Sequence, residues 1–243
     1  TEVLAAETAN ITGANVALVA GSGIGVGGAN AAGDIDTTVS GNFAAQTTSG
    51  DINIHNVGGL TIGALTTLAG VQITGGAVGD DITVRAASPL TVNSAVVNTG
   101  GGNITLAAEG NTAADDLTLA ANVTTAGGNG TISLFAGHDV LHNAGTIAAA
   151  GAGNVNVSAG EDFNGGTNQA GNADGDVTMT NGLTIQSGSG AISVEATTNV
   201  VLSILTTTGN VTVSADDNDF ALANNVGAIT EVLAAETANI TGA

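Results

Sequence analysis

The chain lacks cysteine, lysine, tryptophan and tyrosine, and it has one proline, one methionine and one arginine among its 243 residues. Without cysteine there is neither a disulfide framework nor a thiol nucleophile. Without tryptophan or tyrosine, and with only four phenylalanines, large aromatic side chains cannot fill a broad globular core. We therefore expect a thin core built from small aliphatic side chains.

Positive charge is almost absent, because 21 acidic residues face Arg85 alone and the formal net charge is −20. Phosphate backbones are bound by Lys and Arg, which displace condensed counterions, so this composition excludes nucleic acid as a partner. Anionic membrane surfaces need basic segments in the same way. The sequence also contains no apolar run long enough for a transmembrane helix, so we expect no membrane insertion.

A long exact repeat is the most informative feature that is present. Residues 1–14, TEVLAAETANITGA, recur without change as residues 230–243. We interpret residues 1–229 as one complete super-repeat and residues 230–243 as the start of the next copy. Such a sequence predicts a tandem array in which each unit stacks directly on the last coil of the unit before it.

A short motif also recurs along the chain, in which two turn residues precede an apolar, a polar and an apolar residue. This period of two predicts a short β-strand with one buried face. The motif occurs at Gly50–Ile54, Asp80–Val84, Gly102–Leu106, Gly130–Leu134, Gly153–Val157, Gly175–Met179, Gly190–Val194 and Gly209–Val213.

The spacing of these motifs indicates how the strands are arranged. Most successive motifs lie about 20–23 residues apart, which is the coil length of a β-solenoid. Three short strands and corners rich in Gly and Asn fit into each coil, whereas a meander of hairpins would need tight two-residue reversals. We therefore predict an all-β fold, a parallel β-helix (β-solenoid) with three short strands per coil.

One run carries a family resemblance, LTLAANVTTAGGNGTISLFAGHDVLHNAGTIAAAGAGNVNVSAGED, at Leu117–Asp162. It resembles the repeat regions of very large secreted bacterial surface proteins of the filamentous haemagglutinin type, and the resemblance extends over roughly residues 33–223. It implies a right-handed parallel β-helix, export across a Gram-negative envelope and an extracellular location at the bacterial cell surface. It also implies display as an extended adhesin or fibre.

Paired acidic residues at the predicted corners are the only recurring polar feature that suggests a ligand. Clustered carboxylates are the ligands that Ca²⁺ prefers, although no segment matches a known calcium-binding repeat or an EF-hand loop. The alternative is that these residues are solvated turn residues and that cations only screen them diffusely. We expect no other cofactor. The calcium candidates are Asp80, Asp81, Asp115, Asp116, Asp216, Asp217 and Asp219.

No constellation of catalytic residues is evident, and we predict that the chain is not an enzyme. A polysaccharide lyase or hydrolase on a β-helix is the catalytic alternative, but such sites use basic residues beside carboxylates, or aromatic platforms for sugars. Arg85 alone does not provide this. His138 and His142 would converge on a helix, but their segment alternates like a strand, so they do not suggest a metal site.

The resulting hypothesis is a structural one. The chain is the repeating unit of a giant extracellular bacterial fibre, which provides length, rigidity and resistance to proteases. Its partners are further copies of itself, joined end to end and in lateral association. The alternative is an adhesin shaft, in which protruding loops such as residues 162–176 bind a glycan or a cell-surface receptor.

Overall fold

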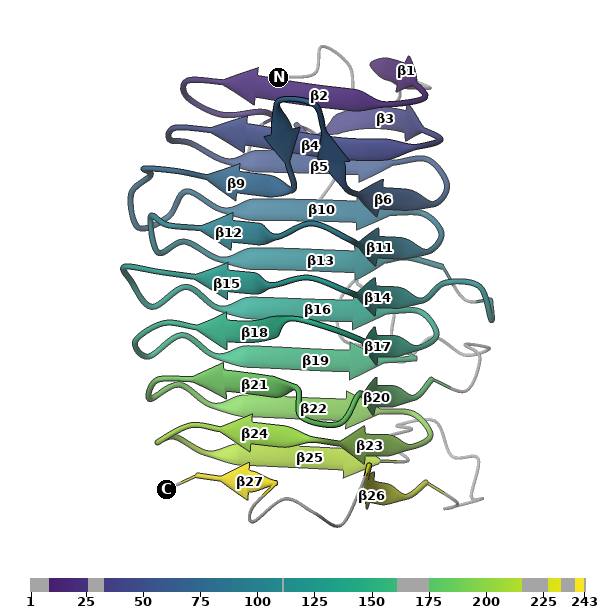
Figure 1. Ribbon diagram of the computed structural model, residues 1–243, viewed down its shortest axis with the longest axis vertical. Helices are drawn as coiled ribbons and strands as arrows, with labels where there is room; N and C mark the ends of the chain where they lie inside the picture. The colour runs from purple at the N-terminus through teal and green to yellow at the C-terminus, as the bar shows by residue number, and fades with distance from the viewer. Residues whose placement is uncertain are drawn as a thin grey trace.

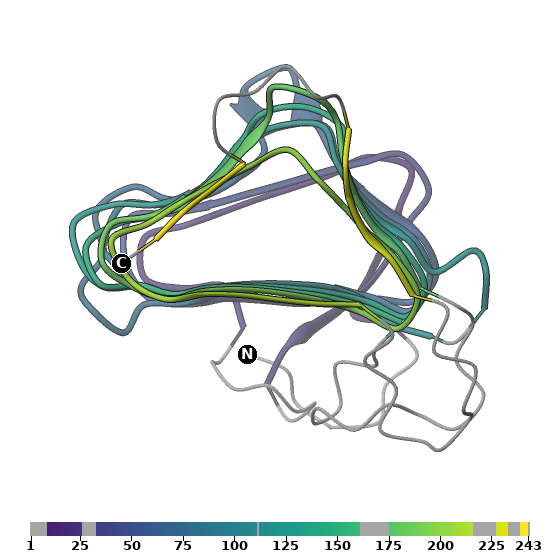
Figure 2. The same ribbon diagram turned by 90° about the horizontal axis from the view of Figure 1, so that it is seen from below.

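A computed structural model of the chain describes residues 9–25, 33–110, 112–160, 175–215, 227–232 and 239–242. These residues form a right-handed parallel β-helix. In Figure 1 the strands nearer the viewer run to the left and those behind run to the right while the chain descends, which gives the handedness. Seen along its axis, the solenoid has a triangular cross-section (Figure 2). The predicted fold is confirmed.

Three faces make up the solenoid. The first face is a nine-stranded parallel sheet. Its strands are β1 (Ile11–Gly13), β3 (Ile35–Val39), β5 (Ile52–Asn56), β10 (Ile82–Ala86), β13 (Ile104–Ala108), β16 (Ile132–Ala136), β19 (Val155–Ala159), β22 (Ile192–Ala196) and β25 (Val211–Ala215).

The second and third faces consist of shorter strands, joined into one sheet at the N-terminal end. The second face contains β6 (Leu60–Ile62), β11 (Leu90–Val92), β14 (Leu117–Leu119), β17 (Val140–His142), β20 (Val177–Met179), β23 (Val200–Leu202) and β26 (Ile229–Glu231). The third face contains β9 (Val71–Ile73), β12 (Val96–Asn98), β15 (Val123–Thr125), β18 (Thr146–Ala149), β21 (Thr184–Ser187), β24 (Ile204–Thr206) and β27 (Ile240–Thr241).

The first coils depart from this three-strand plan. Strand β4 (Asn42–Thr47) pairs with β6 through its first residues and with β9 through its last three, so it bends across both faces. Strand β2 (Val16–Ala20) pairs with β4 along its whole length. A small antiparallel hairpin, β7 (Ala64–Leu65) and β8 (Leu68–Ala69), is inserted before β9.

The core is a narrow column of aliphatic side chains in register from coil to coil. Ile82 lies between Ile52 and Ile104 in neighbouring strands, and all three are fully buried. The middle residue of each motif, such as Thr83, lies in line with its equivalents on the outer side. Because side chains alternate along a strand, the first and third positions of this motif are enclosed, as the period of two predicted.

Coil length is less uniform than the motif spacing suggested. Equivalent corner residues lie 22 residues apart at Asp81 and Asn103 but 28 apart at Asn103 and Thr131. The coil from Asn154 to Ala191 spans 37 residues. The strands keep their register through these changes, so the additional residues are accommodated outside the paired segments.

The duplicated segment occupies different faces at the two ends of the chain. Near the N-terminus Ile11 pairs with Thr37 on the first face. Near the C-terminus its counterpart Ile240 pairs with Leu205 on the third face. The sequence Asn-Ile-Thr alternates polar and apolar residues, and every face of the solenoid accepts such a segment with the isoleucine inward. Its face is therefore determined by its neighbours along the chain.

A column of glycines lines the corner that precedes the first face. A Cβ atom on Gly153 would overlap the carbonyl oxygen of Gly130 in the coil before it, and Gly130 and Gly190 are restricted in the same way by their own neighbours. Here the coils approach each other so closely that only a residue without a side chain fits.

We expect Gly153→Ala to lower the free energy of unfolding by about 1–3 kcal/mol, because the backbone of the adjacent coil has to move. Gly21→Ala is the matched control, since no atom lies within 4 Å of the position of its Cβ. Chemical denaturation of both variants measures the difference. Equal stability of the two variants would contradict the close approach of the coils.

Candidate functional site

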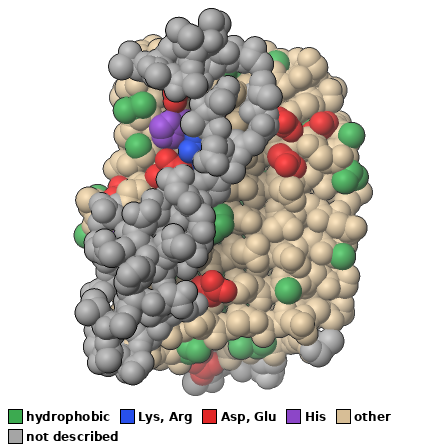
Figure 3. Space-filling view, turned by 180° about the vertical axis from the view of Figure 1, so that it is seen from behind, with side chains coloured by type: hydrophobic (Ala, Val, Ile, Leu, Met, Phe, Trp, Pro, Cys, Tyr) green, Lys and Arg blue, Asp and Glu red, His purple; other side chains and the backbone are tan. Residues whose placement is uncertain are grey.

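The only arginine of the chain lies in a cluster of charged residues on the first face. Parallel register places Asp36 beside His55 and His55 beside Arg85 on three successive strands, β3, β5 and β10. Asp34 precedes β3, and Glu109 follows β13. In Figure 3 the histidine and arginine colours lie next to each other, with carboxylates around them. We call these five residues the Arg85 cluster.

The guanidinium group of Arg85 bridges two carboxylates from different coils. Its Nη2 donates to Asp34 Oδ2, and its Nη1 donates to Glu109 Oε1 at 3.0 Å. The side chain of Arg85 is 7% exposed and that of Asp34 is 2% exposed. At such depth an unpaired charge would cost several kcal/mol, so each partner requires the other.

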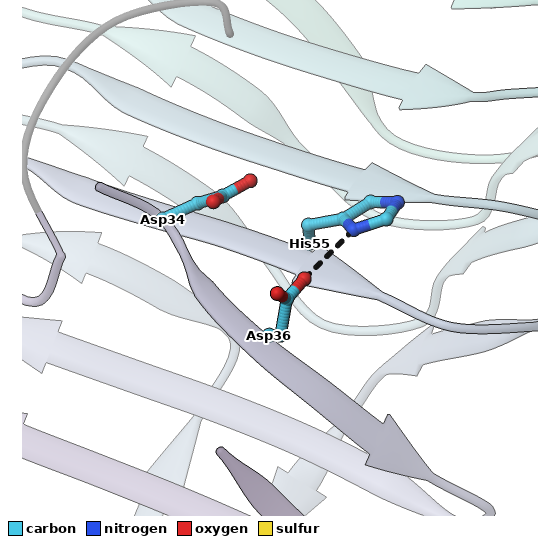
Figure 4. Close-up of side chains that lie close together, drawn as sticks. All are labelled: Asp34, Asp36 and His55. Carbon is cyan, nitrogen blue, oxygen red and sulfur yellow. Dashed lines mark hydrogen bonds and ion pairs between the residues drawn. The ribbon is translucent and has the colours of Figure 1, made fainter. Parts of the chain in front are cut away.

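The imidazole of His55 completes the cluster. Its Nδ1 lies 2.9 Å from Asp36 Oδ1, as the close-up in Figure 4 shows, and its Nε2 lies 3.4 Å from Glu109 Oε2. Hydrogen bonding to Glu109, and then to Asp36, raises the pKa of His55 despite its partial burial. Burial opposes ionisation of Glu109, but His55 and Arg85 together hold the pKa of Glu109 below its ordinary value.

These contacts indicate that the Arg85 cluster holds coils together. Arg85 is neutralised by its own carboxylate partners, which leaves little of its charge for a substrate. The oxygens of Asp34 and Asp36 and a ring nitrogen of His55 lie within 4.8 Å of one another, so these three residues could hold a metal ion. In the structure these atoms are already engaged, because Asp34 accepts a hydrogen bond from Arg85 and Asp36 is hydrogen-bonded to His55.

Sequence reasoning missed this cluster because it counted Arg85 as an isolated basic residue. The signal was present in the motif alignment, where His55 and Arg85 both occupy the fourth position of a first-face strand. Stacking the motifs by register would have placed the two side chains on adjacent coils. Asp34 and Glu109 give no such signal, because both lie outside the strands.

A second cluster contains one of the predicted calcium ligands. His138 Nδ1 lies 2.6 Å from Asp116 Oδ1 and 3.5 Å from Asp139 Oδ1. Burial raises the pKa of Asp139. Ligand atoms of these three residues lie within 4.8 Å of one another, so this corner could also hold a cation. Sequence reasoning found Asp116 here but not its two partners.

The other predicted ligands within the described ranges bind the backbone. Asp81 Oδ1 accepts the N–H of Asn103 at 2.7 Å, and Asp115 Oδ2 accepts the N–H of Thr112 at 2.8 Å. Asp80 Oδ2 accepts the N–H of Ala77, and backbone N–H groups from Gly50 and Ala77 lower the pKa of Asp80. These aspartates therefore stabilise corners, and calcium binding stays a prediction.

Corner residues of this kind form hydrogen-bonded ladders between coils. The backbone N–H of Asp81 binds Asp51 Oδ1, that of Asn103 binds Asp81 Oδ1, and that of Thr131 binds Asn103 Oδ1, at 2.7–2.9 Å. A side-chain oxygen thus serves the corner of the next coil, where the strand ladder is interrupted. This role was not predicted.

Two groups of predicted residues lie outside the described residues. Asp216, Asp217 and Asp219 belong to the first group, and most of the predicted receptor-binding loop, residues 162–174, forms the second.

The histidine pair, His138 and His142, lies within the described residues, and its two side chains do not converge. His138 lies at a corner, whereas His142 is buried in the core, where burial lowers its pKa.

A hollow of about 390 Å³ lies at the N-terminal end of the solenoid. Its lining includes Ile11, Leu18, Ile24 and Ile35. Apart from Ile24, which is buried, these side chains are only partly buried although they pack against the core. Among the described residues, no strand pairs with β1 or β2 beyond this end of the core.

We expect Arg85→Met to lower the free energy of unfolding by about 3–5 kcal/mol, because it leaves Asp34 buried without its cation. The double variant Arg85→Met/Asp34→Asn is the matched control and should recover most of this loss, since no buried charge remains unpaired. Urea denaturation measures both variants. A single variant as stable as the wild type would show that the cluster does not hold the coils together.

The Arg85 cluster should also make stability depend on pH. The raised pKa of His55 contributes stability below its unfolded value of 6.5, and this is lost as pH rises through the folded pKa. The lowered pKa of Glu109 contributes stability above 4.5, and this is lost as pH falls through the folded pKa.

The urea midpoint of the wild type should therefore exceed that of His55→Gln by more at pH 5.5 than at pH 8.5. Comparing the two proteins at each pH cancels the contribution of His142, which has the opposite sign. A difference between them that does not change with pH would contradict the assigned role of His55.

Comparison of the chain with family models, curated proteins and solved structures found no match. The resemblance to filamentous haemagglutinin repeats therefore rests on the sequence pattern and stays a prediction. Within the described ranges, no helix has the length and apolar character needed to cross a membrane.

Proposed function

We propose that this chain is a structural repeat of a giant extracellular bacterial fibre, to which it contributes length, rigidity and resistance to proteases. The observation that carries this proposal is a ladder that can be extended at both ends. Within the described residues, β1 and β2 have strand partners on one side only, and so do β25, β26 and β27. Unpaired parallel edges are templates for further strands.

The duplicated sequence identifies a partner for these edges. The described residues of the second copy add strands to the second and third faces, through β26 and β27. Ile229 and Ile240 remain 52% and 47% exposed there, although each is an apolar residue of a strand. A further coil would bury them, so continuation of the repeat removes an apolar surface that is otherwise in contact with water.

The charge distribution fits a fibre in a salt-containing medium. The acidic residues outside the Arg85 cluster have no Lys or Arg side chain to neutralise them. Neighbouring shafts therefore repel each other at low ionic strength, and this repulsion keeps single rods soluble. In a salt-containing medium, dissolved cations screen the repulsion. The location outside a bacterial cell follows from the family resemblance, as part of this proposal.

Proteins with one, two and three repeats test the proposal. Because coils are stacked about 4.8 Å apart, each repeat should lengthen the particle by about 40 Å at constant width. Electron microscopy of the three proteins measures this directly. Separate globular particles joined by a linker, or a width that grows with repeat number, would overturn the proposed shaft.

We also expect the native fold to protect the only trypsin site of the chain. Arg85 is 6% exposed and lies within β10, and cleavage needs an accessible, locally unfolded segment. Trypsin should leave the folded protein intact and cut it into two fragments after denaturation.

The control is Val78→Arg, which places a trypsin site at a residue that is 78% exposed and outside the strands. This variant should be cut at residue 78 in the folded state. Cleavage of the folded wild type at the same rate as Val78→Arg would contradict protection by the fold.

A further inference from the structure

Among the residues that the structure describes, β25 has no strand partner on the outer edge of the first face. Val211 and Val213 are only partly buried here, while the same positions of the preceding strand, Ile192 and Val194, are fully buried. Figure 1 places β25 in the last complete coil, above β26 and β27. The inference below rests on the proposed function, because the partner we identify is the following repeat.

The strand that fits this edge has a recognisable sequence. Each of the six strands from β10 to β25 on the first face has aliphatic residues at its first and third positions and alanine at its fifth. Val16–Ala20, with the sequence VALVA, has the same pattern. Asn15 precedes it, as Asn210 precedes β25. In this structure, however, β2 lies against β4 on the other two faces.

The position of the second copy shows where its next strand would lie. Ile240 and Thr241 lie on the third face, and the third face leads to the first face in every coil from β9 onward. In the preceding coil Leu205 lies six positions before Val211, and Leu205 is the partner of Ile240. The counterpart of Val16 follows Ile240 by five positions in the repeated sequence, which brings it to the start of the first face.

We therefore propose that in the array β25 of one repeat pairs with Val16–Ala20 of the next, in parallel, with Val211 opposite Val16 and Ala215 opposite Ala20. The arrangement of β1 and β2 in this structure is then that of the terminal coil, which has no preceding coil to dock on. In every later repeat the counterpart of β1 lies on the third face, and the counterpart of β2 lies on the first face.

The sequence that follows each strand supports the same assignment. The long segments 160–176 and 216–228 each separate a first-face strand from a second-face strand, β20 and β26 respectively. Residues 21–34 are a third long segment, which separates Val16–Ala20 from the first-face strand β3. If Val16–Ala20 lies on the first face, all three long segments follow a first-face strand in the sequence.

Cysteine pairs in a two-repeat protein distinguish the two placements, because the chain has no native cysteine. Partners in adjacent parallel strands have Cα atoms close enough for a disulfide. The junction pair is Thr212→Cys in the first repeat with Ala17→Cys in the second. Both native side chains are exposed, so the variants should fold. Ser214→Cys with Val19→Cys, in the same two repeats, is a second junction pair.

The matched control is Val19→Cys with Gln46→Cys within one repeat, since Val19 and Gln46 are partners between β2 and β4. We expect this control pair to oxidise in the first repeat but not in the second, and the junction pairs to oxidise. Mass spectrometry after alkylation of free thiols measures each disulfide.

Failure of both junction pairs to oxidise, or oxidation of the control pair in the second repeat, would overturn the inference. The proposed function fails on a different observation, because it requires one continuous rod in electron micrographs whichever strand docks on β25. A continuous rod without the junction disulfide therefore rejects the inference alone.

Discussion

Parallel pairing in register between successive coils is the interaction on which the rest of the structure depends. Each coil gives its backbone N–H and C=O groups to the coils on either side, so a change in one coil affects its neighbours. The glycine column and the ladders of Asp and Asn side chains both occur at corners, where the strand ladder is interrupted. The composition follows from this constraint, because a narrow column is filled mainly by aliphatic side chains and its corners favour Gly, Asn and Asp.

The same constraint explains how the chain carries its charge. Acidic residues at the surface cost little, because water and salt screen them, and several of them stabilise corners through backbone hydrogen bonds. The single Arg is used where carboxylates from separate coils come together under partial burial, so Arg85 connects coils that are distant in sequence. The unpaired strand edges at both ends of the described part follow from the same stacking, since a ladder that can accept another coil at any point has no intrinsic stop.

Sequence reasoning predicted the parts of the structure that depend on local pattern. Alternation within each motif determines which side chains face the core, so strands such as Ile82–Ala86 and the β-helix itself could be predicted. His55 beside Arg85 could have been found from the motif register, but the place of Asp34 in the Arg85 cluster could not, because Asp34 and Arg85 are 51 residues apart and meet only after two irregular coils. The face occupied by the duplicated segment was also beyond local pattern, since Asn-Ile-Thr fits every face equally well. The longer coils were also beyond local pattern, because corner segments can lengthen without changing the register of the strands.

The central claim is that strands lie across the axis of a continuous rod and stack along it. Diffraction from aligned filaments of a protein with many repeats tests this most directly. The account predicts a sharp reflection near 4.8 Å along the filament axis, from the spacing of neighbouring strands. A 4.8 Å reflection perpendicular to the axis, or none in the axial direction, would contradict it, because the strands would then run along the filament or fail to stack continuously from one repeat to the next.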